Sequence, residues 1–137
     1  MPGIAHRLAR DHHIAPEAAA GACLFWAFST LIGYTDMHGG NLSFVAEQVR
    51  PCALAPAWDM KLMAFAPRSG GGLPDTVPGA VIHAGVAHDM WRQAEAMGRI
   101  CLARVSGDGR FSARFAPCIA ALVNHLHTAS ARIVRLG

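Results

Sequence analysis

Charged side chains are scarce in this sequence. Only 15% of its 137 residues are charged and 53% are hydrophobic, whereas typical soluble domains carry about 25% charged residues. A chain of this composition exposes apolar surface unless something covers it, so we expect part of a larger body or one half of an oligomer. The formal net charge of +3 is mild and the basic residues are scattered, which argues against direct binding of nucleic acid or of an anionic membrane.

A C-x-x-C pair is also missing. The four cysteines lie far apart, at Cys23, Cys52, Cys101 and Cys118. Their spacing argues against a zinc ribbon or a redox pair, and buried free thiols in a reducing cytoplasm are the simplest interpretation. Cys118 with His125 and His127 is a weak alternative metal set, because an H-x-H pair on one helix directs its two rings to different faces.

No apolar run is long enough to cross a bilayer. The most apolar segment, residues 18–33, is shorter than the roughly 20 residues of a membrane span and contains Ser29 and Thr30. Asp11 and Glu17 in its approach, and the lack of a cleavage site, argue against a signal sequence. We interpret the segment as a buried helix.

Apolar spacing predicts a single, mainly α domain with one short hairpin. We expect a lead-in, loose or helical, at 1–14, a central helix at 15–32, a polar loop and hairpin at 33–65, a mobile loop at 66–79 and a helical bundle at 80–137. Pro16 suits the first turn of the central helix, and Gly33 ends it. The expected strands are 41–47 and 52–59.

Two helices are predicted within the C-terminal bundle. The first, 82–104, has an apolar stripe at Val86, Met90, Ala94, Met97 and Cys101, and Gly98 weakens it or splits it in two. The second, about 112–134, has a stripe at Phe115, Ile119, Leu122, Leu126, Ala129 and Ile133. The methionine and aromatic side chains on these faces are interpreted as core.

The polar run "TDMHGGN" at residues 35–41 carries the candidate chemistry. Asp36 and Asn41 have the D-x-x-x-x-N spacing of protein kinase catalytic loops, in which Asp accepts the proton of the attacking hydroxyl and Asn binds Mg²⁺. Its two glycines permit a tight turn. Asp59 is the candidate second carboxylate, because a hairpin would bring it back to Asn41. In the plainer interpretation Asp36 caps a helix end and Asn41 is a turn residue.

The two motifs "LIGYTDMHGGNLSF" and "LAPAWDM" resemble the HipA-like serine/threonine kinases, best known as toxins of bacterial toxin–antitoxin modules. The family pattern is an apolar helix, then N-x-T-D-x-H-x-x-N, then a hairpin that ends in L-x-P-x-Y-D. Tyr34 and Trp58 depart from this pattern. The motif match covers residues 31–79 and is most similar to the HipH (YjjJ-like) branch.

The resemblance implies a Mg²⁺-dependent transfer of the ATP γ-phosphoryl group to a protein Ser or Thr. It assigns Asp36 as the catalytic base, and Asn41 and Asp59 as the ligands of the metal and its nucleotide. His38 either donates a hydrogen bond to the transferring phosphoryl group or braces the loop.

The sequence lacks the parts of an N-terminal kinase lobe. No glycine-rich loop precedes Asp36, and the single lysine, Lys61, follows Asp59. The chain therefore resembles a C-terminal lobe alone, inactive in isolation, and its expected partners are the missing lobe or a second chain, an antitoxin, a protein substrate or a second copy. The run "SGGG" at 69–72 is a flexible loop or, less simply, a phosphate-binding loop.

Two other functions remain open at this point. The same cluster of two Asp, one His and one Asn, including Asp59, could with a divalent ion activate water for attack on a phosphodiester, with arginines steering the nucleic acid backbone. These are Arg92, Arg99, Arg104, Arg110 and Arg114. Alternatively, the chain is a binding or dimerisation module without catalysis.

Overall fold

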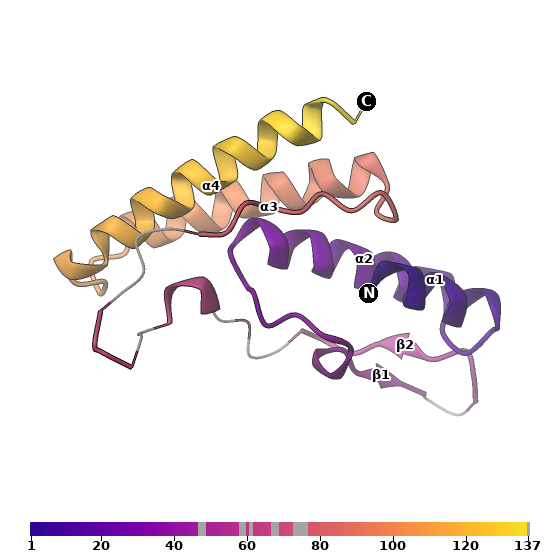
Figure 1. The fold of residues 1–137 in the computed structure, drawn as a ribbon. Coiled ribbons are helices and arrows are strands. Elements are labelled where there is room, and N and C mark those ends of the chain that lie inside the picture. The colour runs from indigo at the N-terminus through magenta and orange to yellow at the C-terminus, as the bar shows by residue number, and fades with distance from the viewer. Residues whose placement is uncertain (47–48, 58–59, 61, 67–68, 73–76, 137) are drawn as a thin grey trace.

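The computed structural model describes residues 1–46, 49–57, 60, 62–66, 69–72 and 77–136. Within these residues the chain forms the helices α1 (Pro2–Arg10), α2 (Pro16–Leu31), α3 (His88–Gly107) and α4 (Ala116–Val134). Helix α2 packs against α1 and α3, and α3 packs against α4. The segment that follows α2 turns back beneath it and carries a small hairpin, so that α2 lies between the hairpin and the α3–α4 pair (Figure 1).

Helix α2 confirms the predicted central helix. Pro16 occupies the first turn, where the missing N–H costs nothing, and the residues after Glu17 are small or apolar on every side. Ala22 and Leu31 are fully buried. A helix that is apolar all round must be covered on several faces, and α1, α3 and β2 supply that cover. The predicted lead-in is the short helix α1.

The main core lies between α2, α3 and α4. Its largest fully buried side chains are Leu31, Trp91 and Ile133, one from each helix. A second cluster joins α1, α2 and the hairpin, with Leu42 and Phe44 packed against the alanines of α2. A third, centred on Phe65, joins the short 3₁₀ helix Met63–Phe65 to α4. Three apolar clusters therefore stabilise the described part of the protein, and each of them includes residues of α2 or α4.

Helix α3 corrects two predictions. It begins at His88, not at residue 82, and it continues through Gly98 without a break to Gly107. Its buried face consists of Trp91, Ala94 and Gly98, whereas Met97 is 39% exposed. A Cβ on Gly98 would lie 3.3 Å from Leu126 Cδ1, so the missing side chain lets α4 approach α3 at this point. The buried stripe of α3 therefore passes through Gly98 and not through Met97, one residue away from the predicted stripe.

Helix α4 follows the predicted stripe more closely. A 3₁₀ turn at Ala113–Phe115 precedes it, so the α-helix begins at Ala116 rather than near residue 112. Leu122, Leu126, Ala129 and Ile133 are buried. His125 is buried and His127 is exposed, which confirms that the two histidines face different ways.

The predicted hairpin is present with very short strands. Strand β1 (Phe44–Val45) pairs antiparallel with β2 (Ala53–Leu54), with Phe44 opposite Leu54. The backbone before α2 extends the pairing, since Cys52 N–H donates to His13 O (3.0 Å) and Ala15 N–H donates to Cys52 O (2.9 Å). These bonds fix the hairpin to the α1–α2 turn.

Cys23 is a buried free thiol, as predicted, whereas Cys52 and Cys101 are free thiols that are only partly buried, which corrects the prediction of burial for these two. Burial raises the pKa of the Cys23 and Cys101 thiols. In the part of the chain that the structure describes, no helix has the length and apolarity of a membrane span.

Candidate functional site

The polar loop, residues 35–41, starts from a tightly defined helix end. Ile32 N–H donates to Phe28 O (3.0 Å) and Tyr34 N–H donates to Ser29 O (2.9 Å), with Gly33 between them at φ 74°. This is the Schellman arrangement, which closes a helix through a left-handed residue. Gly33 O also accepts a bond from Ala64 N–H (3.0 Å). The direction in which the polar loop leaves α2 is thereby fixed.

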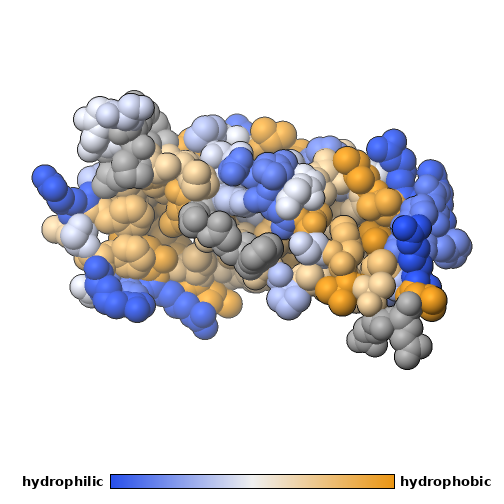
Figure 2. All heavy atoms as spheres, turned by 90° about the horizontal axis from the view of Figure 1, so that it is seen from below, coloured by the Kyte–Doolittle hydropathy of each residue, from blue (hydrophilic) through white to orange (hydrophobic). Residues whose placement is uncertain are grey.

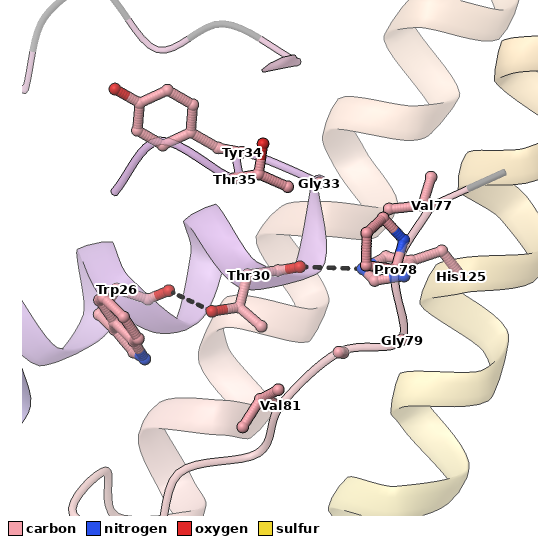
Figure 3. Close-up of a pocket in the computed structure, with 11 residues that line it drawn as sticks. Trp26, Thr30, Gly33, Tyr34, Thr35, Val77, Pro78, Gly79, Val81 and His125 are labelled. Atoms are coloured by element: carbon pink, nitrogen blue, oxygen red, sulfur yellow. Dashed lines mark hydrogen bonds between the residues drawn. The ribbon is translucent and has the colours of Figure 1, made fainter. Parts of the chain in front are cut away.

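A buried histidine completes this helix end. The last carbonyls of a helix lack intrahelical partners, and His125 Nε2 on α4 donates to the carbonyl oxygen of Thr30 at 2.9 Å (Figure 3). This bond ties α4 to the end of α2 and gives His125 a structural role. It also removes this nitrogen from the metal set with Cys118 that the sequence left as a weak alternative.

The middle of the polar loop is exposed and held by few contacts. Asp36 and His38 are exposed, and Met37 is partly buried. Ser29 Oγ, which is fully buried, donates a weak bond of 4.0 Å to Met37 Sδ. The loop thus contacts α2 through Met37, the residue after Asp36. The Asp36 carboxylate itself remains exposed to solvent.

His38 braces the turn that follows. Its Nδ1 accepts the N–H of Gly40 at 3.1 Å and so caps the short 3₁₀ helix Gly39–Asn41. A neutral imidazole that accepts at Nδ1 carries its proton on Nε2. Bracing the loop therefore leaves an N–H that is able to donate to a bound group.

Asn41 is oriented by Tyr34. The Asn41 Nδ2 amide donates a short hydrogen bond to the Tyr34 hydroxyl, and Tyr34 is only 8% exposed. No hydrogen bond to the Asn41 Oδ1 oxygen is found among the described residues. Because a side-chain amide has one donor end and one acceptor end, this arrangement presents the oxygen, the atom that binds hard cations.

Tyr34 is the residue that the sequence reasoning missed. From the sequence it is only a departure from the family pattern, without a predicted role. The sequence gives only a weak indication of this role. Tyr34 is the single tyrosine of the chain, and it lies seven residues before Asn41, with two glycines between them.

The hairpin pairs the backbone just after Asn41 with the backbone of Ala55. Ala55 N–H donates to Ser43 O at 2.9 Å, and Ser43 lies two residues after Asn41. Asp59, four residues after Ala55, is outside the residues that the structure describes, as is Lys61. The proposed meeting of Asp59 with Asn41 therefore stays a prediction.

A cavity of about 220 Å³ opens beside the start of the polar loop. Its walls come from α2, from the extended segment 77–81 and from His125 on α4 (Figure 3). Arg132 Nη1 donates to Ala80 O at 2.8 Å, so the segment that directly follows the predicted mobile loop is tied to α4. The Trp26 Nε1 donor is buried and has no partner among the described residues.

The charges offer little support for the nucleic acid alternative. Two of the five arginines that this alternative needs form ion pairs: Arg99 Nη2 bonds to Glu95 at 2.7 Å, and Arg110 bonds to Asp108.

No group of three or more His, Cys, Asp or Glu side chains that would hold a metal is found within the described parts of the chain.

The face below α2 is strongly apolar. Figure 2 shows it with apolar atoms gathered over both halves. Exposed apolar side chains occur throughout the described chain, among them Val49 (80%), Val81 (72%) and Val134 (61%). The surface is therefore as apolar as the composition predicts.

The mainly helical body with one exposed Asp-to-Asn loop is similar in sequence to a bacterial toxin. The similar protein is Toxin YjjJ of Escherichia coli (strain K12), which is 29% identical over 136 residues, or 99% of this chain. The chain spans about 30% of the length of this relative. No protein family model matches the sequence, and no solved structure matches it.

Proposed function

We propose that this chain is the C-terminal catalytic lobe of a HipA-like kinase, which transfers the γ-phosphoryl group of ATP to a protein Ser or Thr in a toxin-type role in the bacterial cytoplasm. The observation that carries the proposal is the geometry of the polar loop. Asp36 is exposed and follows the hydrogen-bonded end of α2. Five residues later, the Asn41 amide is held by Tyr34, and its oxygen has no hydrogen bond to the described residues. The similarity to Toxin YjjJ supports the toxin role.

In this proposal each polar residue of the loop, together with Asp59, has its own role in phosphoryl transfer. Asp36 accepts the proton of the attacking hydroxyl, for which an exposed carboxylate is accessible. Asn41 Oδ1 and the Asp59 carboxylate would hold Mg²⁺, which when bound would supply positive charge to neutralise the phosphates. His38 keeps the turn closed through Nδ1 and donates Nε2–H to a phosphoryl oxygen. The oxygen donors suit Mg²⁺, which takes few protein ligands and keeps water and phosphate oxygens.

The apolar face supports a partner that completes the site. The chain has no glycine-rich loop before Asp36 and no lysine there, so the nucleotide clamp has to come from another lobe or another chain. An exposed apolar surface of this kind marks an interaction site. We propose that the complementary lobe covers it, with an antitoxin and the protein substrate as further partners.

The test is a phosphorylation assay with radiolabelled ATP. The chain alone and the chain joined to the part of Toxin YjjJ outside the matched region are compared. We expect no useful transfer by the chain alone and measurable transfer by the joined protein, with a loss of about 10²–10⁴-fold in Asp36→Asn, the range for a lost general base.

Asp11→Asn is the matched control. Asp11 is also an exposed aspartate but lies at the end of α1, so its substitution should leave transfer unchanged. Strong phosphorylation by the chain alone would overturn the assignment as an incomplete lobe, and transfer that survives Asp36→Asn would overturn the assigned base. Metal-dependent nicking of plasmid DNA, lost in Asp59→Ala, would instead favour phosphodiester hydrolysis.

A further inference from the structure

A second cavity, of about 200 Å³, lies where α1, α2 and the start of α3 meet. Three of its lining residues have side chains that bind soft metal ions: His6 on α1, Cys23 on α2 and Met90 on α3. The remaining lining is small and apolar, from Ala9, Pro16, Ala19, Ala20 and Ala87. The polar loop and the proposed kinase chemistry use none of these residues.

We propose that His6, Cys23 and Met90 form a binding site for Cu(I). Imidazole, thiolate and thioether are the ligand types that soft monovalent copper prefers, and a thioether in particular does not suit Mg²⁺ or Ca²⁺. Each ligand comes from a different helix, so the ion would join α1, α2 and α3 at one point.

The separation between the Cys23 sulfur and the His6 ring nitrogen fits a shared ion. Cys23 Sγ lies 3.6 Å from His6 Nε2. With metal bonds of roughly 2.3 Å to sulfur and roughly 2.0 Å to nitrogen, as zinc shows, a separation of 3.6 Å corresponds to an S–metal–N angle of roughly 110°. That angle is close to tetrahedral, so the two atoms need little movement to bind one ion.

Charge balance selects a monovalent ion. A thiolate, a neutral imidazole and a thioether together carry one negative charge, which Cu(I) cancels. A divalent ion would leave a net positive charge in an apolar cavity, and an uncompensated charge in such surroundings is strongly unfavourable. Among the described residues no carboxylate lines this cavity to offset it.

Binding requires two proton movements that the site allows. The Cys23 S–H bond breaks as the S–Cu bond forms, and the proton leaves to solvent without any change of oxidation state. His6 Nε2, now 3.0 Å from Gly85 O, exchanges this hydrogen bond for the metal, while its proton moves to Nδ1. His6 is exposed, so water can serve Nδ1, and one neutral hydrogen bond is weak beside a metal bond.

The burial of Cys23 makes the site selective by size. Cys23 is 1% exposed, which shields the thiol from bulky reagents but leaves it within reach of a bare ion through the cavity. Burial also raises the pKa of this thiol, so protons compete with the metal.

The experiment is an anaerobic Cu(I) titration of the purified protein against a colorimetric Cu(I) chelator. We expect one equivalent to bind with high affinity and to raise the melting temperature. Cys23→Ser should weaken binding at least 100-fold, and Cys101→Ser, which alters a partly buried thiol outside the cavity, should bind as the native protein does.

Met90→Leu is a second variant that should still fold, because the exchange nearly keeps the side-chain volume while it removes the sulfur. X-ray absorption should show two sulfur neighbours around copper in the native protein and one in Met90→Leu. The proposal is overturned if no copper binds, if Cys101→Ser loses as much affinity as Cys23→Ser, or if the sulfur count stays unchanged in Met90→Leu.

Discussion

The helical body and the polar loop are held in opposite ways. In the body, side chains such as Trp91 and Ile133 are completely buried between three helices. In the loop, Asp36 and His38 are exposed, and position is set by a few hydrogen bonds from the end of α2. Apolar packing thus provides the free energy of folding, whereas the loop geometry depends on individual polar contacts that add little to stability.

The largest expected effect is in the body. Trp91→Ala should lower the free energy of unfolding by about 3–5 kcal/mol, because it removes a large side chain from a closed core. Chemical denaturation checks this value. Ile100→Ala on the same helix, where the side chain is 55% exposed, should change stability by no more than about 0.5 kcal/mol. Equal losses in the two variants would contradict the assigned core face of α3.

The next effect is at the junction between body and loop. Gly33→Ala forces a side chain into a left-handed conformation and places its Cβ 3.2 Å from Val77 and 3.3 Å from Ala64. We expect a loss of about 1–3 kcal/mol in denaturant unfolding. Gly72→Ala serves as the control, since a Cβ there meets nothing within 4 Å of the described atoms. If Gly33→Ala is as stable as this control, the helix end does not constrain the loop.

Within the loop, Tyr34→Phe removes the acceptor of the Asn41 amide but keeps the buried ring. Stability should fall by about 0.5–1.5 kcal/mol, the net value of one hydrogen bond. If the proposed Mg²⁺ site exists, Mn²⁺, used as its spectroscopic substitute, should bind more weakly to the chain joined to the rest of Toxin YjjJ, because the Asn41 oxygen is no longer held in place. Unchanged Mn²⁺ affinity, measured by electron paramagnetic resonance, would show that Tyr34 does not orient Asn41.

The smallest effect is a pH dependence of the body. Desolvation pushes the pKa of Glu95 upward, but hydrogen bonds from Arg99 and Ser130, with the charges of Arg99 and Arg92, outweigh it and hold the pKa below its ordinary value of 4.5. A lowered carboxyl pKa stabilises the fold above pH 4.5, and this contribution is lost as the pH falls through the folded-state value.

Denaturation of the native protein and of Glu95→Gln at pH 7 and pH 3 tests this linkage. The native protein should be the more stable of the two at pH 7, and the difference should shrink at pH 3. A difference that stays constant with pH would mean that the ion pair to Arg99 does not contribute.

The sequence predicts the body better than the loop. Helix α2 was predicted almost to the residue, because proline and glycine mark its two ends. The start of α3 was placed too early, because apolar periodicity reports burial and not conformation. Val86 is indeed in the core and Ile82 packs against it, but both belong to the extended segment and turn before α3.

The polar loop shows the opposite limit. The spacing of Asp36 and Asn41 identified it, but the hydrogen bond between Asn41 and Tyr34 depends on how the loop closes in three dimensions, which no periodicity encodes. The place of Met97 outside the core has a similar origin, since it depends on the approach of Leu126 to Gly98. Contacts between elements decide both features.

The link between α2 and Asp36 has a consequence for how this protein can vary. Each residue added to an α-helix turns everything beyond it by roughly 100°. Because Tyr34 N–H is bonded to Ser29 O, the loop turns with the last residues of α2. An insertion or deletion of one residue within Pro16–Leu31 would swing the Asp36 carboxylate to another side of the molecule. The position of Asp36 therefore constrains the length of α2 as well as its sequence.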